Sequence, residues 1–422
     1  MLINFTVGNY RSFKEKKTLS MEATAIKELK ESVIEENKYR LLPSAVIYGA
    51  NSSGKSNLLK AIATMKGVVL SSVRLNPGET LDYDPFALSM ENIACPTFFE
   101  MEFFLSSVNY RYGFEYDESK ILSEWCYEKC EGEKEYNLFV RKGGGIGVSK
   151  KRFPEGLGKE MSTADNRLFL SLVAQLNGEK AQRIISWFHN CNLISGIESG
   201  GYEGFTIKML FEKLKGYDSA LEFFQKLQLG FENIDVLESE FSEAMLPSRM
   251  PETISMQMKK TLEGRKMLSV MTKHKIYDEA GEVVSVLPFN KDKMESEGSK
   301  KIIDLSGPIF DSLLTGKVLI VDELDAKLHS ILTRQIIKLF RDRESNPNNA
   351  QLIFATHDTN LLNVKTFRRD QVWFTEKDSC EGTDLYSLAE FREPDGTKIR
   401  KDRSLESDYI NGRYGAIPYI KG

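Results

Sequence analysis

Residues 44–57, SAVIYGANSSGKSN, decide the fold of this 422-residue chain. The stretch begins with an apolar run that is typical of a β-strand. It continues, from Gly49 to Ser56, with the spacing G-x-x-x-x-G-K-S of a phosphate-binding loop. Apolar residues then recur at helical spacing from Leu58 to Val69. A loop rich in glycine and serine can match the pattern by chance, but a strand before it and a helix after it favour a nucleotide site.

The chemistry of phosphate binding explains the residue types of this loop. Gly49 and Gly54 let the backbone turn tightly, so that successive N–H groups converge on phosphate oxygens at the N-terminus of the helix. Lys55 adds a positive charge against the β and γ phosphates, and the hydroxyl of Ser56 is placed to bind Mg²⁺. The predicted nucleotide-binding residues of the loop are Gly49, Asn51, Ser52, Ser53, Gly54, Lys55, Ser56 and Asn57.

The second half of a nucleotide site follows in KVLIVDE, residues 317–323. Its apolar run predicts a parallel strand that is buried on both faces, and open α/β sheets bind ligands at the carboxyl ends of such strands. Asp322 fits a ligand of Mg²⁺. Glu323, which points the other way along an extended backbone, fits the base that polarises an attacking water. The alternative is an acidic strand cap without function, which the phosphate-binding loop makes a weaker explanation.

His357 follows another predicted buried strand, QLIFA at residues 351–355. A structural role is the default for a single histidine. However, the end of a central strand is the place where a γ phosphate would lie, so we predict that His357 contacts it.

Composition excludes several classes of protein. With 41% hydrophobic and 28% charged residues, the chain resembles ordinary globular proteins. It has neither the run of about 18 apolar residues that a membrane helix needs nor a secretory leader, so we predict a cytoplasmic protein without membrane contact. The five cysteines include no C-x-x-C pair and indicate neither a zinc site nor a disulfide framework. The net charge of −4 does not indicate nucleic-acid binding, and the basic residues around Gly143–Gly147 are better explained by a hairpin tip.

Periodicity divides the chain into three parts. Residues 1–158 contain the phosphate-binding loop and, at 97–140, the period-two alternation of an antiparallel sheet. Residues 159–264 have helical spacing without heptads, which predicts a helical insertion rather than a coiled-coil arm. Residues 265–422 contain the other strands of the site. The predicted fold class is α/β.

Five segments together resemble the ABC-type ATPase heads of the SMC, RecN and RecF kind: the phosphate-binding loop, Ser296-Glu-Gly298, Leu319-Ile-Val-Asp-Glu323, Asp325 and His357. Nearly the whole chain, including Asn9–Phe13 and Gly412–Pro418, is similar to the short AAA-type ATPases of bacterial abortive-infection and anti-phage operons. These are the AbiLi and RloA group and relatives such as the AriA and PtuA ATPases. The resemblance implies a P-loop ABC-type head with a mostly parallel core sheet, an antiparallel β subdomain and a helical insertion.

The resemblance also implies that ATP lies sandwiched between two heads, in a homodimer or a higher homo-oligomer. Lys55 and the loop amides would bind the phosphates, and Ser56 with Asp322 would hold Mg²⁺. The other implied roles are activation of water by Glu323, sensing of the γ phosphate by His357, coupling of the two sites by Asp325, capping of the partner's nucleotide by Ser296 with Gly298, and a nucleotide contact by Arg11.

The sequence departs from the family pattern in two places. Many ABC heads have Leu-Ser-Gly-Gly-Gln where this chain has Glu295-Ser-Glu-Gly-Ser299, and OLD-family relatives carry a Toprim nuclease domain that is not found here. The leading hypothesis is therefore an ATPase that assembles on ATP and controls a separate effector, a nuclease or toxin, in anti-phage defence. Its rivals are a RecF-like DNA-repair ATPase and a nucleotide-gated scaffold with little turnover.

Overall fold

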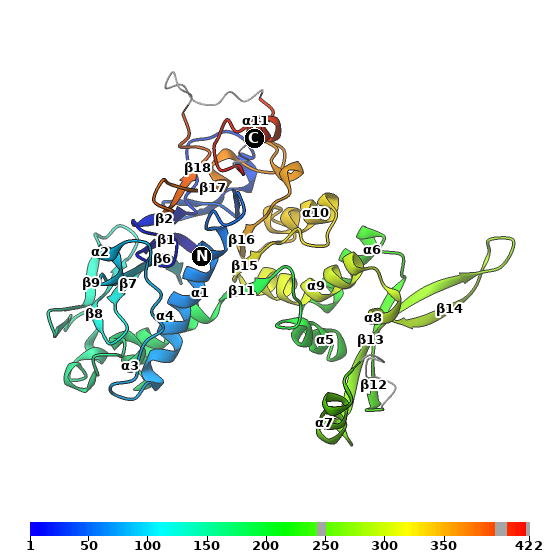
Figure 1. Cartoon of the computed structure of the whole chain (residues 1–422), viewed down its shortest axis with the longest axis horizontal. Helices are drawn as coiled ribbons and strands as arrows, with labels where there is room; N and C mark the ends of the chain where they lie inside the picture. The colour runs from blue at the N-terminus through cyan, green and yellow to red at the C-terminus, as the bar shows by residue number, and fades with distance from the viewer. Residues whose placement is uncertain (243–249, 393–402, 419–422) are drawn as a thin grey trace. The chain divides into compact units, whose positions relative to one another are not determined.

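The computed structural model describes residues 1–242, 250–392 and 403–418. The chain divides into two compact units, which we name the head (residues 1–197 and 315–422) and the inserted unit (residues 198–314) (Figure 1). In the part of the chain that the structure describes, no helix has both the length and the apolar character to cross a membrane.

The core sheet of the head has six strands in the order β11, β15, β16, β5, β17, β18. Their bounds are β5 (Ser44–Gly49), β11 (Cys191–Ser195), β15 (Val318–Asp322), β16 (Gln351–Ala355), β17 (Val372–Lys377) and β18 (Thr383–Ser387). All are parallel except β18. Every residue of β5 and β16 is buried, as expected for parallel strands that are covered on both faces. The prediction of an α/β fold with a mostly parallel core sheet is confirmed.

A second sheet in the head is antiparallel and has the order β10, β9, β8, β7, β6, β1, β2. Its strands are β1 (Leu2–Gly8), β2 (Lys17–Ser20), β6 (Thr97–Leu105), β7 (Val108–Tyr116), β8 (Ile121–Lys129), β9 (Tyr136–Lys142) and β10 (Gly145–Val148). The predicted alternation over 97–140 is therefore confirmed. Phe99, Phe103 and Phe114 are fully buried, so the aromatic stripe belongs to the core. The hairpin between β9 and β10 is also present, but its Arg141 is buried and donates to the carbonyl of Arg167.

Three helices join the two sheets into one hydrophobic core. Apolar residues of α1 (Lys55–Ser71), α3 (Phe169–Gln175) and α4 (Glu179–His189) share a cluster with residues of both sheets. Helix α10 (Ser330–Arg341) packs on β5 and β16. The shorter elements of the head are β3 (Ile34–Glu36), β4 (Tyr39–Leu41), α2 (Met90–Ile93) and α11 (Leu405–Ile410).

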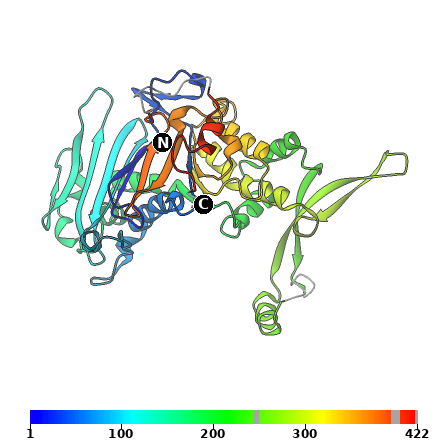
Figure 2. The same cartoon turned by 45° about the horizontal axis from the view of Figure 1, so that its top comes forward.

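The inserted unit combines helices with a three-stranded sheet. Its helices are α5 (Glu203–Phe211), α6 (Tyr217–Leu227), α7 (Glu252–Leu262), α8 (Lys291–Met294) and α9 (Glu297–Thr315). Its strands β12 (Asn233–Glu240), β13 (Lys266–Tyr277) and β14 (Val283–Asn290) pair in that order. Figure 2 shows β13 and β14 as a long hairpin that extends beyond the helices of this unit.

The predicted boundaries of the insertion, residues 159 and 264, are both wrong. Helices α3 and α4 belong to the head, because Leu170, Ile184 and Phe188 are buried in the head's core. At the other end the inserted unit continues through β13 and β14 to Leu314, so it is not purely helical. Helical periodicity reports that a face is buried but not which domain buries it, which is why the sequence did not place these boundaries.

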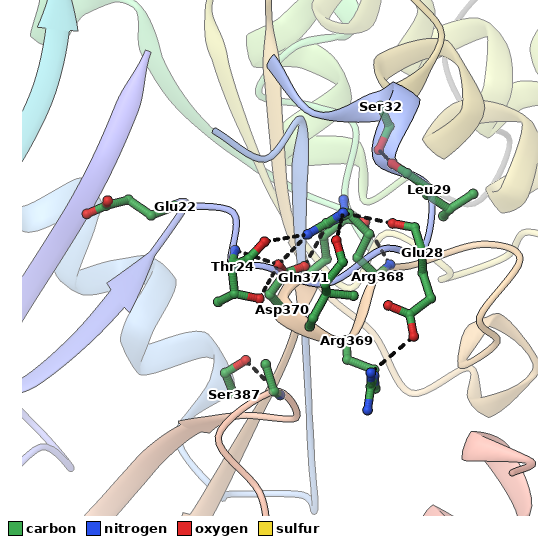
Figure 3. A network of polar contacts seen from close by, with 12 residues as sticks. Glu22, Thr24, Glu28, Leu29, Ser32, Arg368, Arg369, Asp370, Gln371 and Ser387 are labelled. Atoms are coloured by element: carbon green, nitrogen blue, oxygen red, sulfur yellow. Dashed lines mark hydrogen bonds and ion pairs between the residues drawn. The ribbon is translucent and has the colours of Figure 1, made fainter. Parts of the chain in front are cut away.

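A buried polar network lies just before β17, the strand that pairs with β5 (Figure 3). The fully buried guanidinium of Arg368 donates to both carboxylate oxygens of Asp370, at 2.9 and 2.7 Å, and to the carbonyls of Thr24 and Glu28. Asp370 also accepts from the backbone N–H of Thr24 at 2.8 Å. Residues 24–28 are thus held against the segment that leads into β17.

We expect Arg368→Ala to destabilise the head by about 3–5 kcal/mol, because it leaves the buried carboxylate of Asp370 without its cationic partner. The shift of the urea unfolding midpoint, followed by tryptophan fluorescence, measures this loss. Lys338→Ala on α10 is the matched control: its side chain is 56% exposed and its ion pair with Asp342 spans 3.8 Å, so it should change stability by less than about 1 kcal/mol. Equal midpoints for the two variants would contradict the structural role of Arg368.

Candidate nucleotide-binding site

The phosphate-binding loop joins β5 to α1, as its sequence pattern predicts. Gly54 has φ +113°, in the left-handed region that favours glycine, and a Cβ there would lie 2.3 Å from the hydroxyl of Thr383. A Cβ on Gly49 would lie 2.4 Å from the hydroxyl of Ser53 and 2.5 Å from the carbonyl oxygen of Thr375. Close packing of β17 and β18 against the loop therefore requires both glycines.

Lys55 is buried within the loop that it follows. Its ammonium group donates to the carbonyl of Gly49 at 2.7 Å and to that of Ala50 at 3.0 Å. Burial lowers the pKa of Lys55 to about 8, although the nearby carboxylates of Asp322, Glu323 and Asp325 act in the opposite direction. These three carboxylates lie at the end of β15 or just after it, so the two halves of the site share one electrostatic environment.

A hollow of about 550 Å³ lies at the loop. It is lined by Asn51, Ser52, Ser53, Gly54, Lys55, Ser56, Asn57, Glu323 and His357. The lining therefore comes from three segments that are distant in the sequence and follow β5, β15 and β16 at the same edge of the parallel sheet. The fold thus brings the predicted loop residues, Glu323 and His357 together around one hollow.

Asp322 is the last residue of β15 and fits a magnesium ligand. One of its carboxylate oxygens is buried and has no hydrogen-bond partner, which is unfavourable for a charged group unless a cation or water occupies that direction. Among the described residues, no group of three or more histidine, cysteine, aspartate or glutamate side chains could hold a metal. Mg²⁺ does not need such a group, because it commonly binds through one or two protein oxygens, phosphate oxygens and waters. The hydroxyl of Ser56 and the carboxylate of Asp322 fit this mode.

Glu323 lies in a left-handed turn, and the predicted extended backbone at this residue is wrong. Its φ is +57°, a conformation that costs a residue other than glycine about 1–3 kcal/mol and that recurs at functional sites. Strand β15 ends one residue earlier, so the turn directs Glu323 to the hollow that it lines.

Gly196, which the sequence did not indicate, packs directly on this turn. Its N–H donates to the carbonyl of Asp322 at 2.6 Å, and a Cβ at this position would lie 1.8 Å from the carbonyl oxygen of Glu323. Gly196 comes directly after β11, the parallel neighbour of β15. No side chain can therefore be accommodated at Gly196 unless the turn moves.

Asp325 and His357 are in direct contact. The backbone N–H of His357 donates to the carboxylate of Asp325 at 3.3 Å, and the other carboxylate oxygen of Asp325 is buried without a partner. This contact joins the segment after β15 to the segment after β16. The imidazole of His357 lines the hollow and is exposed, as a side chain that meets a ligand should be.

Two of the predicted loop residues direct their side chains into the protein. The hydroxyl of Ser53 is hydrogen-bonded to that of Thr375 at 2.6 Å, and the amide of Asn57 donates to the hydroxyl of Ser12 at 2.8 Å. Thr383 donates to the carbonyl of Ser53 at 2.9 Å and is also bonded to Ser12. These hydrogen bonds attach the loop to β17, to β18 and to Ser12. The sequence did not predict the roles of Ser12, Thr375 and Thr383, because hydroxyl residues in strands and turns carry no spacing signal.

The remaining predicted residues do not line the hollow, and neither do Asp322 and Asp325. Arg11 forms an ion pair with Asp84 at 2.7 Å and borders a separate hollow of about 490 Å³ whose lining shares no residue with the first. Ser296 and Gly298 belong to the inserted unit, at the start of α9. There the exposed hydroxyl of Ser296 accepts from the N–H of Ser299 at 3.1 Å.

Comparison with known proteins identifies one family. The family model described as "AAA domain, putative AbiEii toxin, Type IV TA system" matches residues 44–363, which is most of the chain. This range contains the loop, Asp322 and His357. None of the curated proteins matches the chain.

Solved structures with similar folds include heads of SMC proteins and RecF. An SMC head bound to the C-terminal winged-helix domain of ScpA is 14% identical, with a TM-score of 0.42, and the match covers 92% of this chain and 97% of that one. The SMC head of Thermotoga maritima is 11% identical, with a TM-score of 0.40, and the match covers 92% of this chain and 98% of that one. RecF bound to ATPγS, named as a recombination mediator protein, is 13% identical, with a TM-score of 0.31, and the match covers 91% of this chain and 98% of that one.

Proposed function

Because the chain belongs to the AAA-domain family of the AbiEii type, whose model spans residues 44–363, we propose that its head binds ATP with Mg²⁺ and hydrolyses it to ADP and phosphate. The observation that carries this proposal is the shared hollow, in which the loop with Lys55 faces Glu323 and His357. A site for a small neutral ligand would not need a lysine, an unpaired buried carboxylate oxygen and a loop of backbone donors in one place.

Each residue has a defined task in this reaction. The loop amides and Lys55 bind the β and γ phosphates, and His357 contacts the γ phosphate. Glu323 accepts a proton from the attacking water as the new bond to the γ phosphorus forms and the bond to the bridging oxygen of ADP breaks. Mg²⁺, held by Ser56 and Asp322, would neutralise charge on the phosphate oxygens.

Assembly on ATP is the second part of the proposal. Ser296 and Gly298 of one copy would cap the nucleotide bound to a second copy, and Asp325, through its contact with His357, would couple the two sites. Arg11, whose neighbour Ser12 is bonded to Asn57, would contact the nucleotide after leaving its ion pair with Asp84. The exposed position of Ser296 at the start of a long helix supports this role, because N–H groups at a helix N-terminus favour an anionic ligand.

The biological role that we propose is control of a separate effector protein, a nuclease or toxin, in anti-phage defence. The description of the matching family, which names a putative toxin and a type IV toxin–antitoxin system, supports a role in a system of that kind. The test is a pull-down of the product of the adjacent gene with and without ATP, together with phage plating. An ATPase without a partner and without effect on phage would contradict the role. DNA binding that weakens steeply with salt would favour a RecF-like repair ATPase instead, and ATP binding without turnover would favour a scaffold.

We expect Gly196→Ala to lower the rate of ATP hydrolysis by about tenfold or more while ATP affinity stays within about threefold. The added Cβ must displace the turn that carries Glu323, and misplacing a reacting group by about 1 Å can cost up to 10²-fold in rate. Single-turnover hydrolysis and equilibrium ATP binding measure the two quantities. Gly67→Ala on α1 is the matched control, because a Cβ there meets no atom within 4 Å. An unchanged rate for Gly196→Ala would show that the turn does not set the position of the base.

A further inference from the structure

Glu295, the residue before Ser296, is a buried carboxylate in the inserted unit. Its side chain is 5% exposed. One carboxylate oxygen accepts from the hydroxyl of Thr272 at 2.6 Å and from Nε2 of His274 at 2.8 Å. A buried carboxylate that accepts two hydrogen bonds on one oxygen is held in a single orientation. Loss of either bond would leave its buried negative charge less well compensated, which costs free energy.

Both donors are themselves fixed. Thr272 and His274 are two residues apart on β13, so their side chains project from the same face of the strand. Thr272 is fully buried, and the ring of His274 packs edge-on against Phe231 and Phe289. The strand therefore presents a rigid pair of donors to Glu295.

Glu295 and Ser296 form the turn that joins α8 to α9, and this turn is also anchored on both sides. Before it, the buried ammonium of Lys291 bonds to Asp304 at 2.7 Å and to Glu203 at 2.8 Å. After it, Lys301 donates to the hydroxyl of Tyr202 at 2.8 Å. These contacts hold α8 and α9, while Glu295 is the member of the connecting turn that is tied to β13.

We infer that Glu295 is a positioning residue: Thr272 and His274 on β13 hold it so that the Glu295–Ser296 turn, followed by Gly298 in the first turn of α9, keeps the shape needed to meet the nucleotide of a second copy. The inference rests on the proposed function of that turn. The stem of the β13–β14 hairpin, which no sequence pattern indicated as functional, would thus set the turn that completes the site of the neighbouring copy.

The experiment measures ATP-dependent self-association of the full chain in the Glu323→Gln background by analytical ultracentrifugation. We expect Glu295→Leu to raise the protein concentration for half-maximal association at least tenfold, with ATP affinity within twofold of the parent. Glu295→Gln, which keeps an acceptor oxygen for Thr272, should recover most of the association, and a purely structural loss of packing would not distinguish these two variants. Thr272→Val, which removes one donor, tests the same contact from the strand if Glu295→Leu does not fold. Glu252→Leu, an exposed position on α7, is the control and should behave like the parent.

Ser296→Arg separates failure of the inference from failure of the proposed function. If Ser296→Arg abolishes association while Glu295→Leu and Thr272→Val leave it unchanged, the positioning role is wrong and the role of the turn stands. If the parent does not associate on ATP, or Ser296→Arg has no effect, the proposed role of the turn is wrong and the inference is overturned with it.

Discussion

Lys55→Ala is expected to weaken ATP binding by about 10²-fold or more. The substitution removes a charged donor to the triphosphate, and hydrogen bonds to charged groups are worth about 1.5–3 kcal/mol each. It also leaves Asp322, Glu323 and Asp325 without the cation that shares their surroundings, so the site would repel an anionic ligand. Isothermal titration calorimetry with ATP and Mg²⁺ measures the loss.

Lys338→Ala provides the comparison, because it removes the same charge from an exposed position on α10 of the head. It should bind ATP like the wild type. Thermal melting of Lys55→Ala is needed alongside, because Lys55 also bonds to the carbonyls of Gly49 and Ala50. If a folded Lys55→Ala protein binds ATP with wild-type affinity, the triphosphate does not lie at this loop.

Glu323→Gln is expected to slow ATP hydrolysis by about 10²-fold or more while ATP affinity changes little. The amide cannot accept the proton of the attacking water, and loss of a preorganised group at a reacting centre costs a few kcal/mol of barrier. Because hydrolysis would no longer remove the nucleotide, the ATP-bound assembly should persist on gel filtration. Phosphate release and elution volume are the two readouts.

Glutamine has the same backbone constraints as glutamate, so the left-handed turn at residue 323 is retained in this variant. Its melting temperature should therefore match that of the wild type. Hydrolysis at the wild-type rate would show that another group activates the water. Dissociation of the ATP-bound assembly at the wild-type rate would show that assembly does not depend on intact ATP.

The sequence predicted the parts of the site that are encoded locally. The loop from Gly49 to Ser56 has a fixed spacing because its backbone must surround a phosphate, and the strands before Glu323 and His357 are continuous apolar runs because both faces are buried. The carboxyl ends of parallel strands meet at one sheet edge, which made the shared hollow predictable before its geometry was known.

The residues that the sequence missed act through contacts between distant segments. Ser12 lies near the start of the chain and Thr383 near its end, yet their hydroxyl groups are hydrogen-bonded next to the loop. Gly196 contacts the turn at Glu323 only because β11 pairs with β15. A single glycine after a strand has many explanations in a sequence. The left-handed backbone at Glu323 was missed for a related reason, since the turn is imposed by its neighbours and not by the residue itself.

The strand order of the core sheet has a consequence for biosynthesis. Strand β5, which ends at Gly49, pairs with β16 and β17, and β17 ends at Lys377, more than 300 residues later. At roughly 5–20 residues per second, a ribosome needs roughly 15 to 65 s to make the intervening polypeptide. For most of that interval the nascent phosphate-binding loop has neither of its flanking strands, and β17 is completed only at its end. A growing chain should therefore be unable to capture nucleotide until translation of the head is almost finished.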